Sequence, residues 1–351
     1  MKKTQLASVV GAVALAAAGG IGTLAAAAPA EAAGPALHSR VILDGKAHGW
    51  SSPDDVTFIG PHIFVGFQNG VPSDGPAAGT PQQSTLVEMK PSGQIEQTWN
   101  ITGKIDGLGA DAANSRVLLT VNEDSNSSLY TVNLDGAIQH YTYDEALPHG
   151  GGTDAVSVFH GAIYTSASNP SGGPALYRIT LKDNGVAHVE NTAINTDSTA
   201  AVANAGHSGT AQLALTDPDS NTVVPAAAQR FGGDFMLDAQ GDQQAVFAPS
   251  LAPGAPLQVL NLAQSVDDTT FATHEGGRLV VTDSHADTVD IVDGPLVRGA
   301  AYTAVTPGNA NTPPVPTPAN YLARLNLNDG TLAPLAISGT SVVPHGVTYM
   351  P

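Results

Sequence analysis

One acidic position recurs along this sequence. The strings PDDVTF, KIDGLG, GTDAVS, DPDSNT and VDDTTF each carry aspartate as their third letter, and VPHGVT near the end carries histidine there. The residues at this position are Asp55, Asp106, Asp154, Asp219, Asp268 and His345. Side chains of this kind, brought together, repel one another unless a cation or protons offset the charge. Their recurrence therefore predicts a shared site.

The chemistry of that site follows from its donor atoms. Carboxylate oxygens suit Ca²⁺ or Mg²⁺, and a single histidine also admits Mn²⁺ or Zn²⁺. We predict that one divalent cation is held by some of Asp55, Asp106, Asp154 and Asp268. Asp219 is the weakest member of the set because its segment is irregular, and Asp234 competes for its place.

The elements that position these residues are short strands. Residues 104–143 read KIDGLGADAANSRVLLTVNEDSNSSLYTVNLDGAIQHYTY, in which four apolar stretches are separated by turn residues. The same order of strands and turns begins near residues 54, 154 and 219. Residues 267–294 have the pattern of the first three strands of a fifth unit. Residues 321–337 resemble a third and fourth strand.

Units of about 40 to 50 residues with four short strands are typical of a β-propeller. A β-sandwich also has regular short strands, but it gives no reason for the pattern to recur in phase. We therefore predict an all-β fold with six four-stranded antiparallel blades. Five or seven blades remain open, because residues 195–232 and 296–320 are irregular.

The chain ends on a copy of its first strand pattern. VPHGVTYMP, residues 343–351, repeats the start of a unit and leaves no room for the remaining strands. In a closed ring this segment is the innermost strand of the last blade, and ALHSRVILDG, residues 36–45, supplies an outer strand. Strands from both ends of the chain are therefore expected to close the ring.

A propeller brings the repeated position to one mouth of its central channel, since the first strand of each blade is innermost. Second strands run back antiparallel, so their ends face the same mouth. This second set comprises Gln68, Asn69, Asn122, Glu123, Ser168, Asn169, Gln240, Asp242, Asp283 and His285. His345, Glu123 and His285 are the candidates for acid–base catalysis by residue type.

A structural interpretation of the same residues stands beside the functional one. A buried aspartate at the start of an inner strand can accept hydrogen bonds from backbone amides and join neighbouring blades. DPDSN at 217–221 and NEDSN at 122–126 resemble the opening of a calcium loop, but both lack its glycine and final glutamate and predict turns. His149 lies on the approach to the mouth and is expected to be a loop residue.

The N-terminal 32 residues predict a cleaved secretory signal, with Lys2 and Lys3 before an apolar run and small residues near Ala32. We expect a single propeller domain over 33–351 and an exported monomer, secreted or periplasmic, with no membrane anchor. No cysteine is present, so neither disulfides nor a lipidated cysteine can contribute.

The net charge of the chain restricts the classes of partner that it can bind. The sequence has 13 basic and 31 acidic residues, a net charge of −18. Such a surface repels nucleic acid and anionic lipid and attracts cations. We therefore expect a small molecule, a peptide or a sugar at the mouth.

The units RLVVTDSHADTVDIVDG and RVLLTVNEDSNSSLYTVNLDG resemble the second and third strands of NHL-repeat and SMP-30/gluconolactonase-like propellers. The resemblance implies a six-bladed propeller and covers most of the chain. Its members include divalent-metal lactonases, streptogramin-type lyases, strictosidine-synthase-like enzymes and binding modules, so fold alone does not choose among them. We favour a binding or interaction module, with a metal-dependent lactonase or lyase as the alternative.

Overall fold

The computed structural model describes residues 37–76, 82–145, 147, 152–168, 170 and 172–351. In these ranges the chain is almost entirely β-strand and turn, with short 3-10 turns at Gly45–His48, Ala112–Asn114 and Pro307–Asn309. No helix of the described residues has the length and apolarity needed to cross a membrane. The predicted signal segment lies outside these ranges, as do His149 and Asn169.

The first four blades each contain four consecutive strands, as the repeat predicts. Blade 1 is β2 (Pro53–Ile59), β3 (His62–Phe67), β4 (Gln83–Met89) and β5 (Ile95–Thr102). Blade 2 is β6 (Ile105–Asp111), β7 (Arg116–Val121), β8 (Ser128–Asn133) and β9 (Ile138–Tyr143). Blade 3 is β10 (Thr153–Phe159), β11 (Ala162–Ala167), β12 (Leu176–Lys182) and β13 (Val186–Asn191). Blade 4 is β16 (Ser220–Val223), β17 (Phe235–Ala239), β18 (Gln244–Ala248) and β19 (Gln258–Asn261).

The last two blades are not built from consecutive strands. Blade 5 is β20 (Val266–Phe271), β23 (Ala301–Val305), β24 (Tyr321–Leu325) and β25 (Leu332–Pro334). Blade 6 is β27 (Val347–Met350), β21 (Arg278–Asp283), β22 (Thr288–Asp293), β1 (Leu37–Asp44) and the short β26 (Ile337–Gly339). The hairpin β21–β22 thus leaves β20 and pairs with the two ends of the chain.

The prediction that residues 267–294 form one unit was therefore wrong. β20 pairs with β23, whereas β21 pairs with β27 through Val281 and Val347. Leu279 and Val281 pack with Tyr349 in the same apolar cluster. The hairpin β21–β22 covers β27 in place of strands that follow β27 in the sequence order of the other blades.

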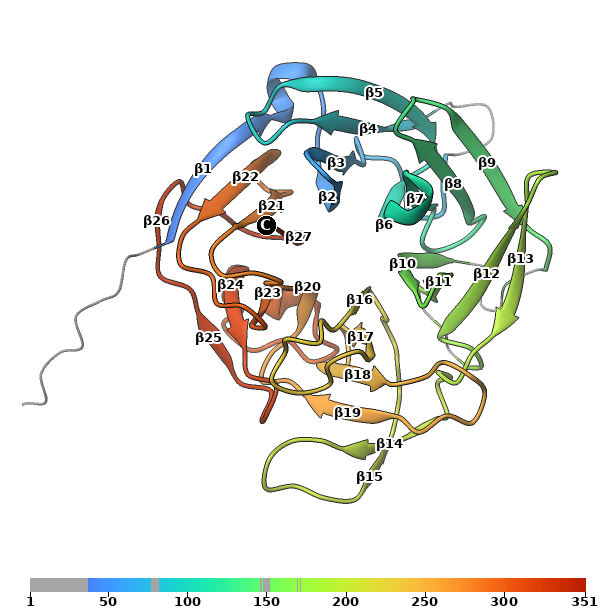
Figure 1. Ribbon diagram of the computed structural model, residues 1–351, viewed down its shortest axis with the longest axis vertical. Helices are drawn as coiled ribbons and strands as arrows, with labels where there is room; N and C mark the ends of the chain where they lie inside the picture. The colour runs from blue at the N-terminus through green and yellow to red at the C-terminus, as the bar shows by residue number, and fades with distance from the viewer. Residues whose placement is uncertain (1–36, 77–81, 146, 148–151, 169, 171) are drawn as a thin grey trace, which may run out of the picture. The chain divides into compact units, whose positions relative to one another are not determined.

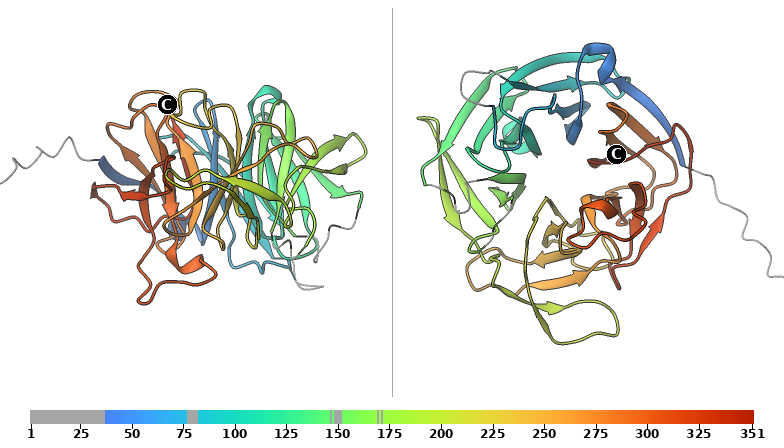
Figure 2. Two further views of the ribbon diagram at one scale, coloured as in Figure 1. Left: turned by 90° about the horizontal axis from the view of Figure 1, so that it is seen from below. Right: turned by 180° about the vertical axis from the view of Figure 1, so that it is seen from behind.

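The predicted closure of the ring by both chain ends is confirmed. β1 pairs antiparallel with β22, and β27 is innermost in the same sheet. The inner strands β2, β6, β10, β16, β20 and β27 contact one another in that order, and β27 returns to β2. Figure 1 shows these strands arranged around one central axis, and the left view of Figure 2 shows the blades from the side. The described residues form six blades.

Apolar clusters fill the space between blades. One cluster joins Phe64, Leu86 and Trp99 of blade 1 to Ile105 and Leu119 of blade 2. Burial of apolar area stabilises such contacts by roughly 25 cal/mol per Å². The irregular segment before blade 4 forms a hairpin of β14 (Thr199–Val202) and β15 (Thr210–Gln212), which adds to the outer strand β19.

Hydroxyl groups join the inner strands of adjacent blades. The Thr120 hydroxyl accepts a hydrogen bond from Gly107 N–H at 2.8 Å and donates to the Asp154 carbonyl of the next blade. Thr282 links Gly346 to the Asp54 carbonyl in the same way. These bridges fix the start of each inner strand, where the candidate site lies.

Closure predicts that the last strand is essential to stability. A chain ending at His345 would lose β27 and expose the edge of β21, so we expect loss of cooperative thermal unfolding, measured by circular dichroism. Removal of Pro351 alone, which is exposed and follows β27, serves as the control and should leave the melting temperature unchanged. A truncated chain that melts like the full one would contradict this closure.

Candidate cation site at the channel mouth

A polar cavity of about 200 Å³ lies where the inner strands begin. The residues that line it are Asp54, Asp55, Gln68, Lys104, Asp106, Glu123, Asp154, Asp217, Asp219, Gln240, Asp267, Asn309 and His345. Strand starts and second-strand ends therefore meet at one mouth. The residues singled out in the sequence that line this cavity are Asp55, Asp106, Asp154, Asp219, His345, Gln68, Glu123 and Gln240, whereas Asp268 and His285 are not part of its lining.

β-Bulges set which residue of each inner strand faces the cavity. In β2 the register shifts between Pro53 and Val56, so that Asp54 and Asp55 lie opposite one residue of β3. The same shift occurs in β6, β10 and β20. The position equivalent to Asp106 is therefore Asp54 in blade 1 and Asp267 in blade 5. The predicted alignment was one residue late in these two strands.

Asp55 and Asp268 instead join neighbouring blades. Asp55 Oδ2 accepts a hydrogen bond from Leu108 N–H at 2.8 Å, and Asp268 Oδ2 accepts one from Val347 N–H at 2.9 Å. Both carboxylates also line a deeper cavity of about 150 Å³ in the channel. Burial, together with nearby carboxylates, raises the pKa of both well above its usual range. This geometry matches the structural interpretation of the repeated aspartate.

His345 neutralises one side of the mouth. Its Nδ1 lies 2.8 Å from Asp54 Oδ1 and 3.0 Å from Asp267 Oδ2. Burial opposes protonation, but the two carboxylates outweigh it and raise the pKa of His345 well above its usual range. The imidazole is therefore cationic at neutral pH, and can donate a proton but not accept one.

Lys104 neutralises a second side. Its ammonium contacts Glu123 and lies 3.2 Å from Asp106 Oδ1. Burial alone would lower the pKa of Lys104, but Asp106, Asp54 and Glu123 raise it. Burial works against ionisation of Glu123, yet the lysine charge lowers the pKa of Glu123 overall. Asp106 Oδ2 is buried without a hydrogen-bond partner, and burial and Glu123 raise the pKa of Asp106 well above its usual range.

The third side has carboxylates but no basic partner among the described residues. Oxygens of Asp154, Asp217 and Asp219 lie within 4.8 Å of one another, and Asp154 also belongs to a group with Asp106 and Glu123. Burial and the charge of Asp267 raise the pKa of Asp217 to about 7. The pKa of Asp154 and that of Asp219 are raised well above the usual range, first by burial and then by neighbouring carboxylates. An oxygen donor set of this kind fits a hard divalent cation.

Several residues of the predicted second set lie outside the cavity. His285 is exposed in the β21–β22 turn, and its backbone N–H donates to Asp283 Oδ1 at 3.0 Å. Asn69 and Asn122 adopt left-handed backbone conformations in turns, and their side chains bond nearby backbone. Asp242 accepts from Thr216 N–H. Gln68 and Gln240 do line the cavity and donate to Asp54 and Asp219, respectively.

Other residues that line this cavity were not predicted from the sequence, namely Lys104, Asp54, Asp267, Asp217 and Asn309. Lys104 lies two residues before Asp106. Because the chain has few basic residues, a lysine so close to a repeated aspartate could have indicated that Lys104 belongs to the site. Asp217 was part of a predicted turn. Asn309 comes from the Pro-rich segment and donates to Gln240 Oε1 at 2.9 Å, a contact that no local pattern indicates.

Comparison with known proteins adds little to this geometry. The sequence matches no family model and no curated protein. The fold is similar to a streptogramin B lyase, with 11% identity and a TM-score of 0.48 over 89% of this chain and 91% of that one. It is also similar to virginiamycin B lyase from Staphylococcus aureus, with 11% identity and a TM-score of 0.46 over 88% and 92%. A putative gluconolactonase gives 12% identity and a TM-score of 0.37 over 76% and 95%.

The bridging role of Asp268 predicts a difference between two variants. Asp268→Asn keeps an oxygen that accepts from Val347 N–H, whereas Asp268→Ala leaves that buried donor unpaired, at a cost of about 1–3 kcal/mol. Urea unfolding should find the alanine variant less stable than the asparagine variant by this amount. Equal stability of the two would refute the bridge.

The raised pKa of Asp217 predicts a pH effect on stability. The folded state holds the proton up to about pH 7, whereas an unfolded aspartate releases it near pH 4. The Asp217 contribution to stability therefore falls as pH rises between these values. In EDTA, Asp217→Asn should raise the melting temperature at pH 8 more than at pH 5. An equal effect at both pH values would contradict this.

Proposed function

We propose that the channel mouth binds one divalent cation, Ca²⁺ in preference, and uses it to bind a small oxygen-rich ligand. The observation that carries the proposal is the group Asp154, Asp217 and Asp219, which has no basic partner in the described chain. Adjacent carboxylates are neutralised by His345 and Lys104. A divalent cation would complete this charge compensation, and water can supply its remaining ligands.

The ligand class follows from size and lining. Small-molecule sites are usually about 300–1,000 Å³, so a cavity of about 200 Å³ fits only one end of a larger ligand or one small one. Amides of Gln68, Gln240 and Asn309 line it beside the charged groups. A sugar, or a peptide end with a carboxylate, offers the oxygens that suit a cation and these donors.

A catalytic role is the second candidate, because a base and an acid share the cavity. Glu123 is ionised beside Lys104, and His345 is protonated between Asp54 and Asp267. A divalent cation there would polarise a carbonyl. Glu123 would then accept a proton and His345 would donate one, which is the division of roles that a lyase or lactonase requires.

Location and assembly are part of the proposal. The signal-like N-terminus supports export, and the absence of cysteine is compatible with it. The acidic surface supports a protein that does not bind nucleic acid or anionic lipid. We propose an exported monomer that meets its ligand outside the cytoplasm.

Calcium binding tests the proposal. Isothermal titration of EDTA-treated, dialysed protein with CaCl₂ should find one site, and Ca²⁺ should raise the melting temperature. Asp219→Asn should weaken binding at least about ten-fold, because it removes one of few charged ligands. Asp183→Asn, at an exposed aspartate outside the cavity, is the charge-matched control and should bind normally. No binding by the unmodified protein would refute the site.

Catalysis has its own test. A panel of lactones and of carbonyl-containing ring substrates should show turnover that is lost in Glu123→Gln while Ca²⁺ binding persists. Cation binding without turnover of any substrate would leave binding as the function of the site.

A further inference from the structure

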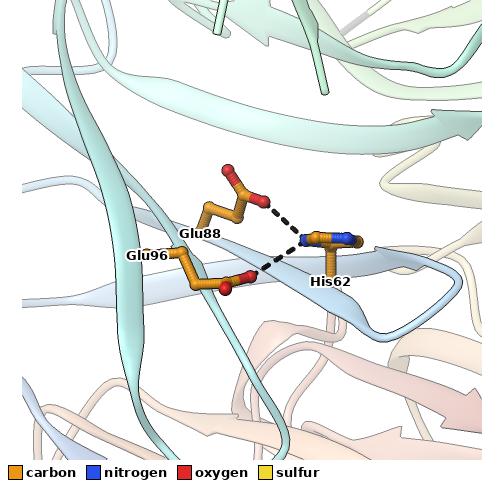
Figure 3. Close-up of side chains that lie close together, drawn as sticks. All are labelled: His62, Glu88 and Glu96. Atoms are coloured by element: carbon orange, nitrogen blue, oxygen red, sulfur yellow. Dashed lines mark hydrogen bonds and ion pairs between the residues drawn. The ribbon is translucent and has the colours of Figure 1, made fainter. Parts of the chain in front are cut away.

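A second group of metal-ligating side chains lies in blade 1, away from the channel mouth. His62 begins β3, Glu88 precedes the last residue of β4, and Glu96 is the second residue of β5. β3 runs toward the mouth and reaches it at Gln68, so its first residue lies at the opposite end of the blade. Figure 3 shows the three side chains converging from these strands.

One ring nitrogen of His62 faces both carboxylates. Nδ1 lies 2.6 Å from Glu88 Oε1 and 3.0 Å from Glu96 Oε2. A ring nitrogen carries at most one proton, in the neutral and the charged imidazole alike, so it can donate one good hydrogen bond here. The geometry thus presents two carboxylate oxygens to a single donor.

The charges around this point are only partly compensated. Lys90 Nζ lies 2.9 Å from Glu96 Oε1, on the other oxygen of that carboxylate. The Glu88 side chain is 6% exposed, and its basic neighbour among the described residues is His62. A nearly buried carboxylate is costly unless a charge or a metal ion compensates it.

We infer that His62, Glu88 and Glu96 form a transition-metal site that takes Zn²⁺. The three donor atoms lie within 4.8 Å of one another. One imidazole nitrogen and two carboxylate oxygens are a donor set that zinc accepts, and three protein ligands leave a fourth position for water. His62 is 31% exposed, so an ion can reach the group from solvent.

Lys90 has a defined part in this site. It holds Glu96 through Oε1, which leaves Oε2 directed at the metal position. Groups that orient a metal ligand in this way contribute to affinity without touching the ion. The ligands come from three adjacent strands, so a bound ion would clamp β3, β4 and β5 together.

This site differs from the mouth in its chemistry. Its nitrogen ligand favours zinc over calcium, whereas the mouth group of Asp154, Asp217 and Asp219 offers oxygen alone. The inference therefore does not depend on the function proposed for the mouth, and the two can fail separately.

Zinc titration tests the site. EDTA-treated protein, dialysed and then saturated with CaCl₂ to fill the mouth, is titrated with ZnCl₂ by calorimetry. We expect one zinc site that is lost in His62→Ala and weakened at least about ten-fold in Glu96→Gln, since even an outer partner costs ten-fold or more. The exposed His207→Ala is the control and should keep this site.

A spectroscopic reading separates a metal site from an ion-pair cluster. With ¹⁵N-labelled histidine, zinc should shift the Nδ1 resonance of His62 and leave that of His207 unchanged. If His62→Ala does not fold, Glu96→Gln gives the binding comparison. Three results would overturn the inference and leave a stabilising ion-pair cluster. They are no zinc binding, equal zinc binding by the unmodified and Glu96→Gln proteins, and a His62 Nδ1 resonance that zinc does not shift.

Discussion

Ring closure is the constraint on which this protein depends. In the described part of the chain, six inner strands contact one another in a circle, so their ends at the mouth surround one axis. Near the start of these strands, the side chains that line the mouth are those of Asp54, Asp106, Asp154, Asp219, Asp267 and His345, and the carboxylates share a cavity of about 200 Å³. Like charges at such short range are tolerated only with counter-charges or protons.

The protein compensates the charge unevenly around the ring. His345 lies between Asp54 and Asp267, and Lys104 contacts Asp106 and Glu123. The group around Asp154 keeps raised pKa values, because burial and neighbouring carboxylates act there without a basic partner among the residues that the structure describes. In the function that we propose, this imbalance would direct a cation to the side of Asp154, Asp217 and Asp219, with His345 and Glu123 on the two other sides of the mouth.

The sequence predicts the architecture well. The alternation of apolar and polar residues indicates which strand faces are buried, and the repeat of the strand pattern at a regular spacing indicates a closed ring of blades. It does not predict the partner of each strand. β21 and β22 have the apolar alternation of any blade, and only tertiary packing with Tyr349 places them in blade 6. The sequence pattern pointed to Asp55 and Asp268 in place of their neighbours Asp54 and Asp267. The reason is that a bulge in β2 and in β20 places two residues opposite one residue of the partner strand, which the sequence pattern does not reveal. Contacts such as Asn309 with Gln240 depend on loop geometry that no local pattern encodes.

We propose that the carboxylates of Asp154, Asp217 and Asp219 at the mouth hold a divalent cation. Anomalous diffraction from crystals soaked in MnCl₂ tests this directly, because manganese prefers oxygen ligands and its anomalous signal locates it without assumption. We expect a peak bounded by oxygens of Asp154, Asp217 and Asp219. Crystals that show manganese elsewhere but none at the mouth would contradict it.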